Sequence, residues 1–224
     1  MEMILAPSML SANFAHLEKD FAAAMLPGVS WLHVDVMDGH FVPNISFGPP
    51  VISCVRKLLP ETFLDVHMMV EEPIRFVEDY KDCGADLITI HAEATTRLEE
   101  TIDAVHKAGM KVGVAISPAT PVDRIIPVLP HVEMVLVMSV VPGYGGQSLI
   151  PETLDKIREL TVHRSKQGLT YDIEIDGGVK LENLDTVLES GANVIVAGSA
   201  IFNGDIARNA GAFLEKLKDY SDRK

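Results

Sequence analysis

The sequence is poor in cysteine, in basic residues and in long apolar segments. Its two cysteines, Cys54 and Cys83, lack the CxxC spacing of a metal or redox motif, so we expect reduced core thiols within helices of a cytoplasmic protein. Lysine and arginine number 19 against 32 aspartates and glutamates, which gives a net charge of −13. This acidic balance argues against nucleic acid and anionic membranes as partners.

No apolar run reaches the roughly 18 residues that a membrane-spanning helix needs. The first residues also lack the basic, apolar and small-residue order of a signal peptide, and residues 3–7 are instead typical of a first core strand. Low-complexity tracts and linkers are missing too. With 224 residues, 47% of them hydrophobic, the chain is long enough for one sizeable core, and we expect a single domain over residues 1–224.

What the sequence does contain is a regular alternation of short apolar segments with amphipathic segments of helical length. The expected strands are Ile4–Pro7, Trp31–Val36, Phe63–His67, Leu87–His91, Lys111–Ile116, Met134–Met138, Asp172–Asp176 and Val194–Ala197. The expected helices are Phe14–Met25, Pro49–Leu58, Pro73–Cys83, Arg97–Ala108, Pro151–Gln167, Leu181–Ser190 and Ile206–Lys218, with Val122–Leu129 a weaker candidate because Pro127 interrupts it.

Eight strand–helix units in a chain of this length predict an α/β fold, the (β/α)8 TIM barrel. An open doubly wound sheet is the alternative, but no GxGxxG follows the first strand. Four of the expected helices are followed by glycine at the position where a left-handed residue commonly ends a helix, namely Gly84, Gly109, Gly168 and Gly191.

Ionisable side chains lie at the C-terminal ends of several expected strands, where barrel enzymes build their active sites. His33 and Asp35 are two residues apart on one strand and therefore share a face. His67 and Asp176 end two later strands. Two imidazoles and two carboxylates suit Zn²⁺, Fe²⁺, Mn²⁺ or Co²⁺, so we predict one divalent cation bound by these four residues. Taken singly, each is more typical of a polar strand end or a helix N-cap, and it is their convergence on one rim that favours the metal.

A second pair, His91 and Glu93, follows the fourth expected strand. The sequence leaves open whether these residues support a metal ligand or begin the next helix. His40, His106, His131 and His163 are expected at the surface or in loops, without a role.

Two glycine-rich loops follow the sixth and eighth expected strands, at residues 138–147 and 197–202. Glycine lets backbone N–H groups approach an anion closely, and phosphate sites after the late strands of a barrel are common. Neither loop contains lysine or arginine, and the nearest is Lys180. A single such loop is more often only a tight turn, but two loops flanking residues 176–178 predict a phosphate site formed by Gly143, Tyr144, Gly145, Gly146, Gly177, Gly178, Gly198 and Ser199.

Taken together, these segments resemble the ribulose-phosphate 3-epimerase family. The resemblance runs in order through residues 6–11 (APSMLS), 32–44 (LHVDVMDGHFVPN), 65–70 (DVHMMV), 138–147 (MSVVPGYGGQ), 176–179 (DGGV) and 197–202 (AGSAIF), and so covers nearly the whole chain. The departures are Met68 in place of leucine, Tyr144 in place of phenylalanine and Asn13 in place of aspartate. None of these is a proposed ligand of the cation.

This resemblance implies an isomerase of the pentose phosphate pathway that inverts C3 between D-ribulose 5-phosphate and D-xylulose 5-phosphate. Removal of a proton next to a carbonyl forms an enediolate, whose developing charge a divalent cation would stabilise. Inversion needs proton-handling groups on both faces of that intermediate. The implied roles are Asp35 as base and Asp176 as acid in the forward direction, exchanged in reverse.

The resemblance also implies further contacts. Ser8, His67 and Asp176 are expected to contact the substrate, and Met37, Met69 and Met138 to cap it, although ordinary core packing explains these methionines equally well. Relatives imply a homo-oligomer, either a dimer or a hexamer.

Three alternatives stay open at this point. An epimerase acting on D-allulose 6-phosphate would use the same chemistry, although residues 145–147 and 177–179 favour the pentulose. A decarboxylase or aldol-type synthase would need an Asp-x-Lys-x-x-Asp run, and Asp35-Val36-Met37-Asp38 lacks the lysine. A non-catalytic phosphosugar-binding barrel would be expected to have lost a carboxylate or an imidazole.

Overall fold

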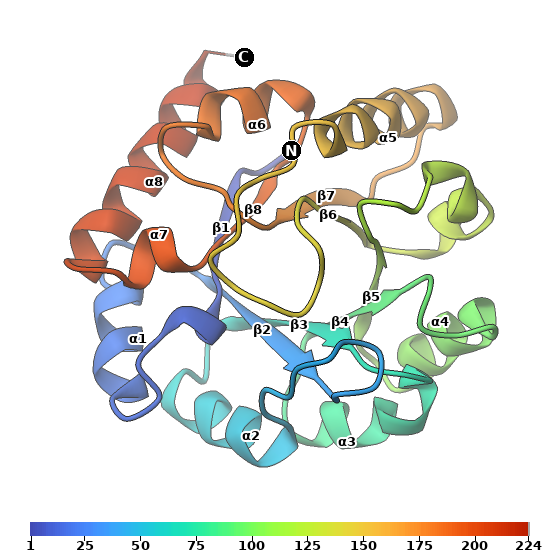
Figure 1. Cartoon of the computed structure of the whole chain (residues 1–224), viewed down its shortest axis with the longest axis horizontal. Helices are drawn as coiled ribbons and strands as arrows, with labels where there is room; N and C mark the ends of the chain where they lie inside the picture. The colour runs from blue at the N-terminus through green and yellow to red at the C-terminus, as the bar shows by residue number, and fades with distance from the viewer. Residues whose placement is uncertain (224) are drawn as a thin grey trace.

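A computed structural model describes residues 1–223 and shows parallel strands arranged around a barrel, with helices on its outside (Figure 1). Lys224, the last residue of the expected domain, lies outside the described residues. The parallel strands and the helices around them confirm the predicted (β/α)8 barrel. Its strands are β1 (Ile4–Pro7), β2 (Trp31–Met37), β3 (Phe63–Met69), β4 (Leu87–His91), β5 (Lys111–Ile116), β6 (Met134–Met138), β7 (Asp172–Asp176) and β8 (Val194–Ala197).

The strands are hydrogen-bonded in the order β1-β8-β7-β6-β5-β4-β3-β2, so β1 and β2 are the two ends of the sheet. These ends meet at one isolated parallel bridge, between Ser8 and His33. We call this junction the β1–β2 seam. Strands of such a barrel are covered on both faces, which explains their nearly continuous apolar sequences.

Most of the predicted helices are present, with shifted ends. The α-helices are α1 (Leu17–Met25), α2 (Pro49–Leu58), α3 (Val77–Asp82), α4 (Leu98–Lys107), α5 (Thr153–Gln167), α6 (Leu184–Ser190), α7 (Ser199–Phe202) and α8 (Ile206–Asp222). Short 3₁₀ helices are η1 (Met9–Ser11), η2 (Pro73–Phe76), η3 (Val122–Arg124) and η4 (Ile126–His131). The four-residue helix α7 is absent from the sequence-based expectation.

Three differences from the predicted helices have local causes. Helix α1 begins at Leu17 instead of Phe14, because the Asn13 side chain accepts a hydrogen bond from the backbone N–H of Ala15 and forms a turn there. Residues 122–129 form 3₁₀ turns instead of an α-helix, since the prolines at 127 and 130 donate no backbone hydrogen bond. Residues 73–76 likewise form a 3₁₀ turn that begins at a proline, before α3.

Glycine behaves as expected at the helix ends, whereas one cysteine does not. Gly168 and Gly191 follow α5 and α6 with φ of 65° and 112°, in the left-handed region. Cys83 is buried as predicted, directly after α3, but Cys54 is exposed. The prediction of a core thiol was wrong there, because the buried face of α2 is formed by Ile52 and Val55.

The two largest apolar clusters among the described residues hold the barrel together. The larger one lies between the sheet and the helices, and a smaller one fills the barrel interior from the side chains of Ile4, Ala6, Leu87, Met134, Val194 and Val196. Trp31 and Phe63 pack against this interior group, and their stacked rings have centroids 4.0 Å apart. Across residues 1–223, a helix with the length and apolarity needed to traverse a bilayer is absent.

Inside the barrel, Thr89 of β4 and Gly113 of β5 lie side by side in register, next to His67 of β3. A Cβ added to Gly113 would overlap the Thr89 hydroxyl and lie 3.2 Å from its Cγ2. Only glycine fits here, because the space beside it is filled by the threonine.

We expect Gly113→Ala to lower the free energy of unfolding by about 1–3 kcal/mol through this overlap. The double variant Gly113→Ala with Thr89→Ala should regain most of that loss, since the Thr89 hydroxyl has no hydrogen-bond partner among the described residues. Urea unfolding of both variants measures the effect. A double variant as unstable as the single one would contradict this account of the barrel interior.

Candidate active site and metal centre

Side chains from three strands converge at the C-terminal end of the barrel. His33 and Asp35 come from β2, His67 from β3 and Asp176 from β7, and one nitrogen or oxygen of each lies within 4.8 Å of those of the other three. His67 Nδ1 is 3.1 Å from Asp35 Oδ1 and 3.9 Å from Asp176 Oδ2. The structure thus brings together the four residues predicted as metal ligands. Parallel strands end at one rim, which explains why residues far apart in sequence meet there.

The hydrogen bonds of His33 test whether a cation fits this group. Its Nδ1 is 2.6 Å from Asp65 Oδ2, the residue paired with it in register on β3. A neutral imidazole has one N–H, so donation to Asp65 leaves a lone pair on Nε2. Nε2 is fully buried, has no hydrogen-bond partner among the described residues, and lies 3.3 Å from Asp35 Oδ1. Either a proton on Nε2 or a cation must lie between this nitrogen and the carboxylate, and the imidazole and carboxylate donors fit a divalent metal.

The two aspartates differ in their electrostatic surroundings. Burial alone would raise the pKa of Asp35, but His33 and His67 outweigh it and hold that pKa well below its usual range. For Asp176, burial and then the Asp35 carboxylate raise the pKa to about 7. Two carboxylates whose pKa values are pushed apart are a recurring arrangement of acid and base pairs in enzymes.

The histidines respond to the same buried charges. Burial would lower the pKa of His33, but the carboxylates of Asp35, Asp65 and Glu174 together raise it well above its usual value. This raised pKa reflects the positive charge that the three groups require beside His33, which a bound cation would supply in place of a proton on Nε2. His67 and His91 show the opposite outcome: burial lowers both pKa values, to about 4 for His91. Both are therefore neutral imidazoles at physiological pH.

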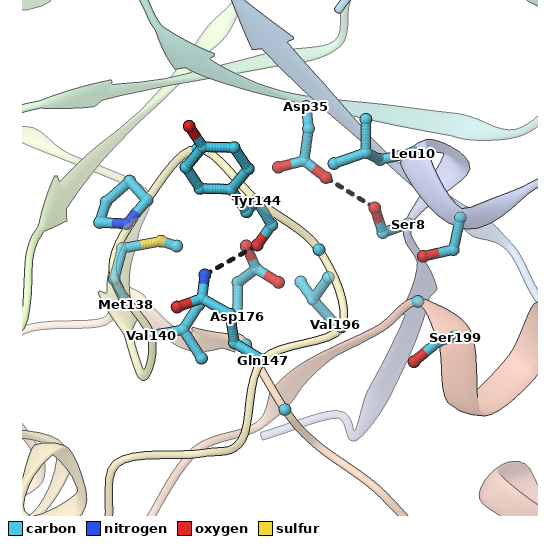
Figure 2. A pocket seen from close by; sticks show the side chains of 18 of the residues that line it. Ser8, Leu10, Asp35, Met138, Val140, Tyr144, Gln147, Asp176, Val196 and Ser199 are labelled. Atoms are coloured by element: carbon cyan, nitrogen blue, oxygen red, sulfur yellow. Dashed lines mark hydrogen bonds between the residues drawn. The ribbon is translucent and has the colours of Figure 1, made fainter. Parts of the chain in front are cut away.

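Ser8 links the β1–β2 seam to the site. It directly follows β1, and its hydroxyl donates a hydrogen bond of 2.6 Å to Asp35 Oδ2. Figure 2 shows this bond and the carboxylates of Asp35 and Asp176 directed into one pocket. Ser8 thus closes the barrel through its backbone and holds a carboxylate of the pocket through its side chain.

One pocket above this group collects the predicted substrate contacts. Its lining includes Ser8, Gly143, Tyr144, Gly145, Gly146, Asp176, Gly177, Gly178, Gly198 and Ser199, together with the three methionines Met37, Met69 and Met138. His67, also predicted as a substrate contact, is fully buried and is not part of the lining. In Figure 1 the segment after β6 crosses the mouth of the barrel, and its residues 142–147 line the pocket.

Sequence reasoning missed part of the lining. The additional residues are Leu10, Ser11, Val140, Pro142, Gln147, Val179, Lys180 and Val196. Several of these residues lie inside the segments that resemble the epimerase family, so the resemblance could have identified them. Gln147 donates to the carbonyls of Val141 and Tyr144 and so ties the loop together, which no sequence pattern indicates. Figure 2 shows the bond to Tyr144.

Glycines let the pocket loops pack against one another. A Cβ on Gly178 would lie 2.8 Å from the Gln147 carbonyl oxygen and would overlap the Leu149 backbone nitrogen, and its φ of 67° is left-handed. A Cβ on Gly198 would overlap the Ser11 hydroxyl. The predicted phosphate loops are therefore in close backbone contact with neighbouring segments of the pocket wall.

His91 and Glu93 lie behind His67, away from the pocket. His91 Nε2 is 2.8 Å from His67 Nε2, and His91 Nδ1 is 3.1 Å from Glu93 Oε2. Helix α4 begins only at Leu98, so Glu93 does not begin it. Of the two alternatives that the sequence left open, support of a predicted metal ligand fits the contacts.

Comparisons with known proteins show which sequences this chain is similar to. Residues 4–202 match the model of the ribulose-phosphate 3 epimerase family. The chain is 48% identical to a ribulose-phosphate 3-epimerase of Synechocystis over 90% of this chain and 88% of that protein. It is 46% identical to the one of Schizosaccharomyces pombe (89% and 86%) and 42% identical to the one of Escherichia coli (90% and 90%).

Solved structures of other barrel enzymes share the fold at low sequence identity. KGPDC from Streptococcus mutans aligns with a TM-score of 0.75 at 15% identity over 96% of this chain and 97% of that one. The 3-hexulose-6-phosphate synthase from Salmonella typhimurium aligns with a TM-score of 0.74 at 17% identity over 97% and 100%. These likenesses support the architecture alone.

We expect the chelator-stripped protein to bind one divalent cation per chain and to unfold at a higher temperature when Zn²⁺, Mn²⁺, Fe²⁺ or Co²⁺ is added, because the ligand set exists only in the folded state. His67→Gln should weaken binding at least about tenfold. The exposed His131→Gln serves as the matched control. Calorimetric titration measures both, and a His67→Gln variant that binds as tightly as the unaltered chain would contradict the site.

Proposed function

The chain belongs to the ribulose-phosphate 3-epimerase family, and from this membership we propose that it inverts C3 between D-ribulose 5-phosphate and D-xylulose 5-phosphate. The observation that carries the proposal is the convergence of Asp35 and Asp176, from opposite parts of the sheet order, on one pocket. Inversion at a carbon next to a carbonyl requires one group to remove a proton and another to return one on the opposite face. The pocket offers two carboxylates for these roles.

In the forward direction Asp35 removes the C3 proton and leaves a planar enediolate. The Ser8 hydroxyl, which donates to Asp35 Oδ2, leaves Oδ1 to face the centre of the site. Asp176 then returns a proton to C3 from the other face, and the carboxylates exchange roles in the reverse direction. Met37, Met69 and Met138 line the same pocket and exclude water from the reacting carbon.

His33, Asp35, His67 and Asp176 are the residues that would hold a divalent cation. When bound, the cation supplies Lewis-acid polarisation of the substrate oxygens next to C3. Mixed imidazole and carboxylate donors accept Zn²⁺, Fe²⁺, Mn²⁺ and Co²⁺ alike, so we propose one such ion per chain and expect cellular supply to select it.

The phosphate group is proposed to lie among the glycine loops of the pocket. A chain with a net charge of −13 repels an anionic substrate, so local donors must overcome that repulsion. Backbone N–H groups around Gly146, Gly178 and Gly198 and the Ser199 hydroxyl are the available donors. Among the described lining residues Lys180 is the only side chain with a full positive charge.

We propose further that residues 1–224 act as one cytoplasmic domain that forms a homo-oligomer, either a dimer or a hexamer. Both thiols are free, as they would be in a reducing compartment.

The proposed substrate is tested by comparing D-ribulose 5-phosphate with D-allulose 6-phosphate on the metal-loaded protein. We expect kcat/KM to favour the pentulose by about tenfold or more, since one additional carbon in a closed pocket is discriminated to this extent. A preference for the hexulose phosphate would assign the chain to the alternative epimerisation. Binding of both without turnover would point to a non-catalytic barrel.

Asp176→Asn should lower epimerisation by about 10²–10⁴ while the C3 proton of ribulose 5-phosphate still exchanges with deuterated water, because Asp35 remains intact. Exchange at C3 of xylulose 5-phosphate should be lost. Asp155→Asn, an exposed site on α5, is the control. Epimerisation at the unaltered rate would refute the role of Asp176, and the reverse exchange pattern would interchange the two roles.

A further inference from the structure

A row of buried polar contacts leads away from the pocket. Asp35 Oδ1 is 3.1 Å from His67 Nδ1, His67 Nε2 is 2.8 Å from His91 Nε2, and His91 Nδ1 is 3.1 Å from Glu93 Oε2. Both imidazoles are fully buried, so water supplies none of their hydrogen bonds from the surface. His91 and Glu93 touch neither the pocket nor the two proposed proton-transfer groups except through His67.

The outer end of this row is fixed by a loop. Glu93 Oε1 accepts hydrogen bonds from the Ser117 backbone N–H, at 2.8 Å, and from the Thr120 hydroxyl. Lys156 of α5 donates to the carbonyls of Ser117, Pro118 and Thr120 and so holds this loop in place. One oxygen of Glu93 is thereby tied to a backbone donor that cannot change its role, and the other faces His91.

Counting protons shows what the row requires. It has three contacts between four groups, and both end groups are carboxylates, which only accept. Two neutral imidazoles carry two N–H groups in all, so two of the three contacts can be hydrogen bonds. Glu93 takes a hydrogen bond from His91 Nδ1, and His91 Nε2 then accepts from His67 Nε2. The third contact, between His67 Nδ1 and Asp35, is left without a proton and faces the predicted cation site.

We propose that Glu93 is a positioning residue: through His91 it holds the proton of His67 on Nε2 and keeps the Nδ1 lone pair directed at the cation. This rests on the metal site of the proposed function. It adds that the identity of a partly exposed carboxylate, two residues beyond β4, decides the tautomer of a ligand that it never touches.

Glutamine at position 93 would reverse the row. Its side-chain oxygen must stay against the Ser117 N–H, so its NH₂ group would face His91 Nδ1 and donate to it. His91 would then carry its proton on Nε2 and donate to His67 Nε2. The proton of His67 would move to Nδ1, where it blocks coordination. Alanine at position 93 removes the acceptor without imposing this reversal.

The test measures Zn²⁺ affinity of the stripped full-length protein by competition with a chromophoric chelator. Glu93→Gln should bind about 10–100-fold more weakly than the unaltered chain, and more weakly than Glu93→Ala. Thermal stability should follow the opposite order, with Glu93→Ala the less stable, because it leaves Ser117 and Thr120 without their acceptor. If Glu93 had only a structural role, the near-isosteric glutamine would reduce both Zn²⁺ affinity and thermal stability less than alanine does.

Glu72→Gln is the matched control, since Glu72 accepts from Thr95 and Arg97 on the same side of the barrel without contacting the site. Two-bond ¹⁵N–¹H spectra of the imidazoles report the tautomer directly: we expect His67 protonated at Nε2 in the unaltered chain and at Nδ1 in Glu93→Gln. Two results would overturn this proposal alone: a Glu93→Gln variant that binds Zn²⁺ as tightly as the unaltered chain, or a Glu93→Ala variant that binds Zn²⁺ more weakly than Glu93→Gln does. An unaltered chain that binds no divalent cation would overturn the proposed metal site and this inference with it.

Discussion

Three carboxyl groups packed around one buried imidazole are the constraint on which the rest of the site depends. His33 lies within 3.3 Å of carboxylate oxygens from Asp35, Asp65 and Glu174, all of them buried. Carboxylates removed from water are costly unless positive charge or hydrogen-bond donors accompany them. The barrel supplies imidazoles, a serine hydroxyl and a site whose ligands suit a cation. Each of these elements answers the same electrostatic requirement.

The strand ends and the ligand group were predictable because they depend on short-range rules. His33 and Asp35 are two apart and so share a face, and parallel strands bring their C-terminal residues to one rim whatever the distance in sequence. The register of neighbouring strands then determines which of these residues are adjacent: Asp35 lies beside His67, and Met138 lies beside Asp176. The glycine loops were predictable as well, because positions such as Gly178 have no space for a side chain and the sequence therefore has glycine there.

The parts that escaped prediction depend on contacts between segments. Glu174 lies in the middle of a strand that is covered on both faces, and only the closed barrel places it beside His33. The partners of Glu93 come from a loop more than 20 residues away. Cys54 is exposed because α2 presents a different face to the core. The late start of α1 is the exception, because the Asn13 turn that causes it is local and involves only residues 13 and 15.

The β1–β2 seam links the stability of the closed strand ring to the binding of ligands in the pocket. The backbones of Ser8 and His33 close the ring of strands, while their side chains belong to the polar group at the centre. Any species that binds these side chains only when the seam is shut adds its binding free energy to closure. The first strand is therefore held in place partly by what occupies the pocket, and transient opening of the ring becomes rarer as occupancy rises.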